Sequence, residues 1–140
     1  MIDYKSFKEV SKVVRSASHR VHKILVKYPS TLEKRMRRLL NRNHIDFKFQ
    51  EVFHKEIGGN HDLTEAFYIA SFYFPKKKIA LVIEDSPSKI TQEERDYIAS
   101  VDGLRTYNIR DISRSIQELR ITKDDFDCPT FNQELFALLR

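Results

Sequence analysis

Residues 67–85 read Phe-Tyr-Ile-Ala-Ser-Phe-Tyr-Phe-Pro-Lys-Lys-Lys-Ile-Ala-Leu-Val-Ile-Glu-Asp, and this stretch decides the fold. Positions 67–74 are apolar or aromatic except for Ser71, and Ile79–Ile83 is an unbroken aliphatic run. Strands that are apolar on both faces are central strands of a covered sheet. The stretch therefore predicts two buried strands joined by a tight basic turn. Its polar exceptions are Ser71 and the closing Glu-Asp pair.

The composition is typical of one intracellular globular domain. The chain has 140 residues, of which 41% are apolar and 32% charged, enough for a real hydrophobic core. No apolar run approaches the ~20 residues that span a bilayer, and the N-terminus lacks an apolar signal region. The single cysteine, Cys128, excludes an internal disulfide and a cysteine metal cluster. We expect a cytoplasmic protein, or one of an organelle matrix if the basic N-terminus is a targeting remnant.

The distribution of charge predicts a polyanion-binding surface. Of the 25 basic residues, 12 lie in positions 1–45 together with only three acids, whereas the remaining chain is mildly acidic. A basic segment on an acidic body most often faces DNA or RNA, although a solvated helix surface is the simpler alternative. The candidate nucleic-acid-binding residues are Lys12, Arg15, Arg20, Lys23, Lys34, Arg35, Arg37, Arg38 and Arg42.

The region before the central stretch predicts two helices and a strand. Apolar residues recur at helical spacing over 4–27, and the capping-box sequence Ser30-Thr31-Leu32-Glu33 starts a second helix. Segment 47–53 alternates as a half-buried strand does, which predicts Phe47, Phe49 and Phe53 on one face and Lys48 and Gln50 on the other. The glycine pair at 58–59 is too short to indicate a phosphate-binding loop.

The region after the central stretch predicts a β-α-β unit. A second capping box, Thr91-Gln92-Glu93-Glu94, opens a helix that ends before Asp102-Gly103. Segment 106–109 then reads as a short last strand parallel to Ile79–Ile83, and Asp111 as the cap of a helix to Leu119. A polar linker over 122–129 precedes an apolar terminal helix.

The predicted fold class is α/β, in the order α-α-β-β-β-α-β-α-α. About four strands form a small mixed central sheet, a meander plus the β-α-β unit, flanked by helices. The expected organisation is a basic N-terminal helix (1–29), an α/β core (30–120) and a C-terminal linker and helix (121–140).

This order of elements resembles the PD-(D/E)xK restriction-endonuclease-like fold, above all the Vsr-like endonuclease domains and the RAP domains. The resemblance covers residues 30–119, and its motifs are short. The matching pieces are Ser30-Thr31-Leu32-Glu33, Phe49-Gln50, Tyr68-Ile69-Ala70-Ser71-Phe72-Tyr73-Phe74-Pro75, Ile79–Ile83 with Glu84-Asp85, and Arg95-Asp96 with Gly103-Leu104-Arg105. The fold implied by the resemblance is an endonuclease-like core.

The resemblance also implies a magnesium-dependent nuclease site, with Glu33, Gln50 and Glu84 as catalytic residues and Glu84 and Asp85 as metal ligands. The departures from the family pattern argue against activity. Ser71 stands where the family has its metal-binding Asp, and a hydroxyl is a poor ligand for a hard cation. Without a gap the family's Glu position falls on Val82, and only a two-residue shift moves it to Glu84.

Three functional hypotheses follow. The first is a nucleic-acid-binding protein on an endonuclease-like fold whose hydrolytic centre has decayed and which needs no cofactor. The second is a divergent Mg²⁺-dependent endonuclease. The third is a structural subunit of a ribonucleoprotein complex that contacts other proteins through its terminal helices. None involves a membrane. For Glu33 the capping box alone is a sufficient structural explanation, and for Glu84 and Asp85 so is solvation of a strand end.

Overall fold

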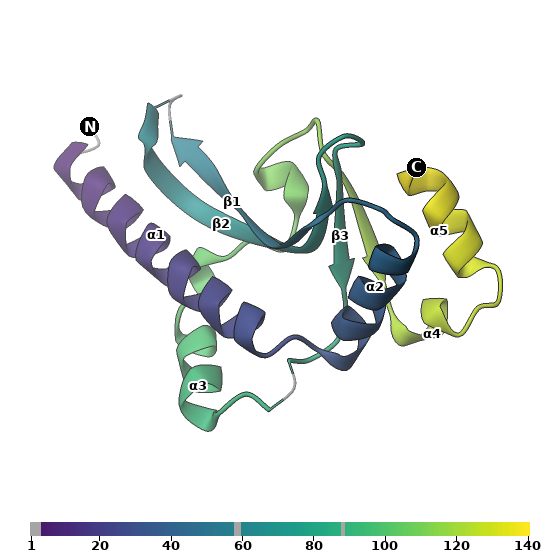
Figure 1. Ribbon diagram of the computed structural model, residues 1–140. Helices are drawn as coiled ribbons and strands as arrows, with labels where there is room; N and C mark the ends of the chain where they lie inside the picture. The colour runs from purple at the N-terminus through teal and green to yellow at the C-terminus, as the bar shows by residue number, and fades with distance from the viewer. Residues whose placement is uncertain (1–3, 58–59, 88) are drawn as a thin grey trace.

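The computed structural model describes residues 4–57, 60–87 and 89–140, so the glycine pair at 58–59 lies outside the described residues. Figure 1 shows the arrangement of the elements. In chain order they are α1 (Tyr4–Lys27), α2 (Thr31–Arg42), β1 (Lys48–Ile57), β2 (Asn60–Phe74), β3 (Ile79–Ile83), α3 (Gln92–Ser100), the 3₁₀ turns η1 (Asp102–Leu104) and η2 (Ile109–Asp111), β4 (Gln117–Ile121), α4 (Lys123–Phe126) and α5 (Phe131–Leu139). They follow the order predicted from the sequence as far as α3, and the predicted linker over 122–129 contains the short helix α4. None of the helices in these ranges is long and apolar enough to cross a membrane.

Within the described ranges the strands form one mixed sheet in the order β1-β2-β3-β4. The β1–β2 and β2–β3 pairs are antiparallel, and β3 and β4 are parallel. The predicted meander followed by a parallel pair is therefore confirmed. The two strands of the central stretch are neighbours, with Phe72 opposite Leu81.

The prediction for the fourth strand was wrong in its position. The parallel partner of β3 is Gln117–Ile121, whereas segment 106–109 contributes only an isolated bridge between Phe67 and Arg105 and then enters the turn η2. The helix predicted from Asp111 to Leu119 is accordingly absent from the described structure. The cause is compositional: β4 reads Gln-Glu-Leu-Arg-Ile, and its charged residues hide the strand pattern.

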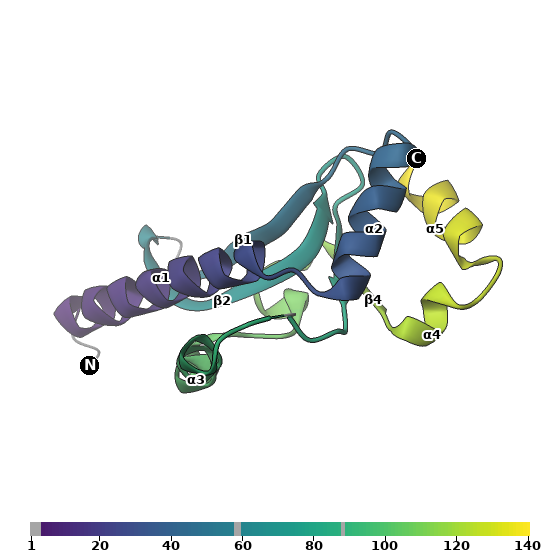
Figure 2. The ribbon, with the colours of Figure 1, turned by 60° about the horizontal axis from the view of Figure 1, so that its bottom comes forward.

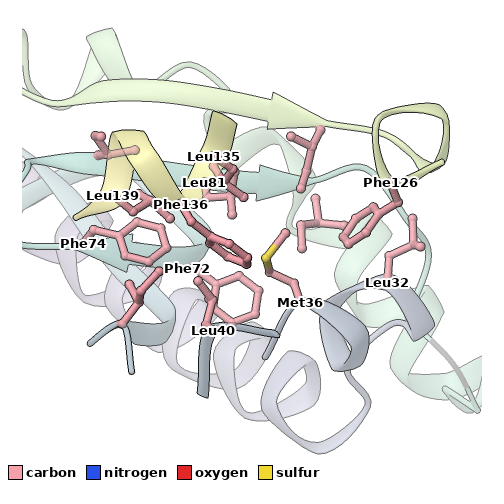
Figure 3. Packing of buried hydrophobic residues seen from close by; sticks show 14 residues of the cluster. Leu32, Met36, Leu40, Phe72, Phe74, Leu81, Phe126, Leu135, Phe136 and Leu139 are labelled. Atoms are coloured by element: carbon pink, nitrogen blue, oxygen red, sulfur yellow. The ribbon is translucent and has the colours of Figure 1, made fainter. Parts of the chain in front are cut away.

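The main core lies between the sheet and the helices α2 and α5. Figure 3 shows side chains of α2 and α5 facing those of β2 and β3 around Met36, which is fully buried. The labelled members are Leu32, Met36, Leu40, Phe72, Phe74, Leu81, Phe126, Leu135, Phe136 and Leu139. A second cluster packs α1 on β2, through Val14 and Val21 against Phe67. Both basic helices are thus fixed to the sheet by their apolar sides.

The predicted alternation of β1 was wrong at Phe53. Phe49 contacts Phe72, whereas Phe53 contacts Tyr73, and neighbouring residues of a strand point to opposite faces. The alternation therefore shifts between Phe49 and Phe53. The cause is Gln50, whose φ of 51° lies in the left-handed region and turns the chain within the strand.

Candidate functional site

A pocket of about 390 Å³ opens where α1, α2, α3 and the end of β3 meet. Figure 2 shows α1 leading through a short connection into α2, with α3 below α1. Five polar residues singled out by the sequence line this one pocket: Glu33, Gln50, Ser71, Glu84 and Asp85. The structure therefore brings together every residue that the resemblance placed in a nuclease site.

Glu33 is 7% exposed and holds the entry to α2 together. Its Oε1 accepts a hydrogen bond from the Ser30 amide at 2.9 Å, and its own amide donates to the Ser30 hydroxyl at 3.1 Å. The predicted capping box is confirmed. Its Oε2 accepts a bond from Gln50 Nε2 at 2.8 Å. Both carboxylate oxygens therefore accept hydrogen bonds. A buried charge is stable only when it is hydrogen-bonded.

Gln50 is 2% exposed, although the sequence placed it on the solvated face of its strand. It lies opposite Ser71, between the paired residues Phe49↔Phe72 and Glu51↔Ala70. A left-handed φ in a non-glycine residue costs about 1–2 kcal/mol. Such strain persists only where the surroundings over-determine it, and it gathers at functional sites. Here the strained residue points its amide to Glu33 beside the pocket.

Ser71 joins β2 to the end of β3, and Asp85 joins the segment after β3 to the start of α2. The Ser71 hydroxyl accepts a hydrogen bond from the Ile83 amide at 3.1 Å. One oxygen of Asp85 accepts from the Leu32 amide at the start of α2, also at 3.1 Å, and the other from the Ser86 amide at 3.0 Å. A carboxylate at a helix N-terminus satisfies an otherwise unpaired amide and the helix dipole.

A charged chain crosses the other side of the pocket. The Tyr68 hydroxyl donates to Glu118 at 2.8 Å, and Arg120 Nε donates to the same carboxylate at 2.6 Å. Arg120 also reaches Glu84 at 3.6 Å and donates to the Tyr107 carbonyl. Because the Glu84–Arg120 pair is long and partly exposed, Glu84 is the least tightly held of the pocket acids.

Two of the pocket acids are engaged as hydrogen-bond acceptors within the protein. Magnesium requires near-octahedral oxygen ligands at about 2.0–2.1 Å. Each carboxylate oxygen of Glu33 and Asp85 already accepts a hydrogen bond, and Ser71 adds no charge. In the described ranges no three His, Cys, Asp or Glu side chains are grouped to hold a metal ion.

The nine candidate nucleic-acid-binding residues are all exposed on α1 and α2. Three of them lie over aromatic rings: Arg20 over Tyr97, Arg35 over Phe126 and Arg37 over Phe49. None of the cations of α2 forms an ion pair with an acid of the described residues. These cations are Lys34, Arg35, Arg37, Arg38 and Arg42. With five cations and the single acid Glu33, α2 carries a net charge of +4.

The sequence reasoning gave no role to Arg95, Arg105 and Tyr107, which also line the pocket. The guanidinium of Arg105 lies over the Tyr107 ring at 4.7 Å. Arg105 belongs to one of the motifs that match the family pattern, but only the three-dimensional structure brings segment 105–107 to the pocket. The signal that could have found it is an Arg-x-Tyr sequence after a Gly turn, which is weak on its own.

Comparison with protein-family models, curated proteins and solved structures finds no match to this chain. The class that fold and site define is thus an α/β protein with a four-stranded mixed sheet and a polar pocket at the end of β3.

The strained backbone at Gln50 predicts that a glycine variant is more stable than an alanine variant, the reverse of the usual order within strands. Gln50→Ala and Gln50→Gly both remove the hydrogen bond to Glu33, but only glycine adopts a φ of 51° without cost. We expect Gln50→Gly to be more stable than Gln50→Ala by about 1 kcal/mol. Urea unfolding of both variants measures this difference. Alanine at least as stable as glycine, the usual order within strands, would contradict the strained backbone.

The buried, hydrogen-bonded phenol of Tyr68 should cause the protein to lose stability at alkaline pH. Burial, and next the hydrogen bond to Glu118, raise the pKa of its phenol above the ordinary value of 10.0. A raised pKa stabilises the fold fully below the unfolded value, and this contribution is lost as pH rises above 10.0 toward the folded value. Tyr68→Phe should therefore flatten the fall in stability above this pH. Unfolding free energies across the alkaline range test it, and an unchanged slope would refute the assignment.

Proposed function

We propose that the chain is a nucleic-acid-binding protein on a restriction-endonuclease-like fold of the PD-(D/E)xK type, in which the hydrolytic centre is degenerate. The observation that carries the proposal is the meeting of two basic helices at a pocket whose acids are held by hydrogen bonds. The mixed sheet, with its meander and parallel last strand, agrees with such a core.

The basic helices supply the binding surface. α1 and α2 each turn their apolar side to the sheet, which leaves their cations in solvent. Burying these cations against phosphates releases counterions, and this supplies most of the affinity for nucleic acid. The stacking of Arg35 and Arg37 on aromatic rings fixes the direction of two guanidinium groups in advance.

The pocket acids support binding without hydrolysis. A phosphodiesterase of this kind needs carboxylates that converge on a divalent ion. In this chain Glu33 and Asp85 instead stabilise the N-terminus of α2, and Ser71 takes the position of the expected acid. Their conversion from ligands to structural acceptors is the degeneracy that the proposal describes.

A divergent Mg²⁺-dependent endonuclease is the second candidate. It is favoured by one observation, that Glu33, Gln50, Glu84 and Asp85 line a single pocket. Under this alternative the loosely held Glu84 would be the first metal ligand.

Removing charge from α2 should weaken binding and its salt dependence. Lys34, Arg38 and Arg42 are exposed and are not stacked on rings, so their joint replacement by Gln changes charge with little effect on packing. If all three contact phosphates, the slope of log affinity against log salt falls by about 2 on single strands and about 3 on duplex. Fluorescence anisotropy with labelled oligonucleotides over a salt series measures the slope.

The matched control replaces Lys76, Lys77 and Lys123 by Gln, which removes the same charge from exposed positions outside α1 and α2. It should leave the slope close to that of the unmodified chain. Equal slopes for both triple variants would show that α2 is not the binding surface. Absence of binding to DNA and RNA would remove the proposal.

The same protein should bind nucleic acid without cutting it. With Mg²⁺ or Mn²⁺ present, we expect no cleavage above that of a Glu84→Ala variant, because the pocket lacks convergent free carboxylates. A gel assay on labelled DNA and RNA measures cleavage. Cutting by the unmodified chain that Glu84→Ala abolishes would establish the endonuclease alternative.

A further inference from the structure

The pocket is lined by aliphatic and aromatic side chains that the metal chemistry of a nuclease does not require. We propose that it receives one unpaired nucleobase of a single-stranded nucleic acid whose phosphates lie on the basic helices. The inference rests on the proposed function and names its substrate class. Its volume of about 390 Å³ lies within the ~300–1,000 Å³ of small-molecule sites.

The walls of the pocket suit a flat, neutral ring. Aliphatic side chains from four elements or their flanks line it, among them Leu25, Ile69, Val82 and Ile98. Apolar walls with a few placed polar groups are the usual form of a site that binds an organic ring. Three acids (Glu33, Glu84, Asp85) and three arginines (Arg95, Arg105, Arg120) also line the pocket, so its formal charges balance, which suits a neutral ring.

The buried amide of Gln50 supplies hydrogen bonds for a base edge. A glutamine amide has two N–H bonds and one carbonyl oxygen. Gln50 uses one N–H bond on Glu33, and the other N–H and the oxygen have no recorded partner in the described structure. An adjacent donor and acceptor match the Watson–Crick edge of an unpaired base, where thymine and uracil present an N–H bond beside carbonyl oxygens. Glu33 holds this amide in place.

Arg105 and Tyr107 form a second polar element of the pocket. Arg105 Nε is buried and without a hydrogen-bond partner in the described ranges, and its guanidinium lies over the Tyr107 ring. A buried donor without a partner costs about 1–3 kcal/mol, which a ligand oxygen would recover. Paired arginine and aromatic side chains are the groups on which bases stack in single-strand-binding proteins.

A base can enter such a pocket only when it is unstacked and unpaired. Extruding a base from a duplex costs a few kcal/mol, whereas a single strand offers its bases freely. The geometry therefore favours single strands. Each inserted base contributes about 1–3 kcal/mol, equal to about 5- to 150-fold in affinity.

The test compares labelled oligothymidylate with an abasic oligomer of the same length, which carries the same phosphates. We expect the unmodified chain to bind oligothymidylate about 5- to 150-fold more tightly. Oligouridylate is the RNA arm. Arg105→Gln should reduce the affinity for thymidylate toward the abasic level, because it removes the buried donor and the guanidinium that face the base. Arg114→Gln is the control, since it removes the same charge from an exposed position outside the pocket.

The outcomes separate the two proposals. Equal affinity for both oligomers would overturn the base pocket and leave the basic surface intact. A preference for thymidylate that is unchanged in Arg105→Gln would also overturn it, because the bases would then bind elsewhere. No binding to either oligomer would overturn the nucleic-acid function and the base pocket together.

Discussion

The carboxylate of Glu33 is the interaction on which the rest of the site depends. It accepts hydrogen bonds from the Ser30 amide and from Gln50, and so ties the start of α2 to β1. Asp85 ties the end of β3 to the same helix terminus through Leu32. Two acids from distant parts of the chain therefore fix one helix N-terminus against the sheet. Through these bonds the N-terminus of α2 lies at the edge of the pocket, which Glu33 lines.

This arrangement connects the fold with the proposed function. A buried carboxylate is costly unless donors surround it, and here the protein itself provides the donors. The acids that would bind an ion in a nuclease thus serve as supports for a basic helix. The strain at Gln50 has the same origin, because its left-handed backbone brings the amide to Glu33. Under the proposed function, both features belong to a binding site built on the framework of a catalytic one.

Much of the fold could be predicted because its signals are local. Both main capping boxes, the helix Tyr4–Lys27 and the buried strand Ile79–Ile83 were recognisable from short patterns. The strand Gln117–Ile121 was missed because it takes its place from parallel pairing with β3 rather than from its own composition. Pairing of this kind is a tertiary effect that a local pattern does not record.

The members of the candidate site were predictable, but of its hydrogen bonds only the Ser30–Glu33 capping box was. Glu33, Gln50, Ser71, Glu84 and Asp85 were all candidates, and they do line one pocket. Their commitment to backbone amides depends on distances between segments far apart in the chain, as with Leu32 and Asp85. The change of face along β1 at Gln50 could not be predicted, because an alternating sequence does not show where a left-handed φ occurs. Arg105 and Tyr107 were missed because they lie far along the chain from Glu33 and Gln50, and only the fold brings them to the same pocket.

The most direct test of the central claim, that the pocket acids are structural acceptors, is paramagnetic broadening by Mn²⁺. The amide signals of the ¹⁵N-labelled chain would be followed by NMR as Mn²⁺ is added below the protein concentration. The account predicts that Ser71, Glu84 and Asp85 broaden no more than exposed acids such as Asp124. Selective loss of the pocket signals at the first additions would contradict it, because the carboxylates would then be free to bind an ion.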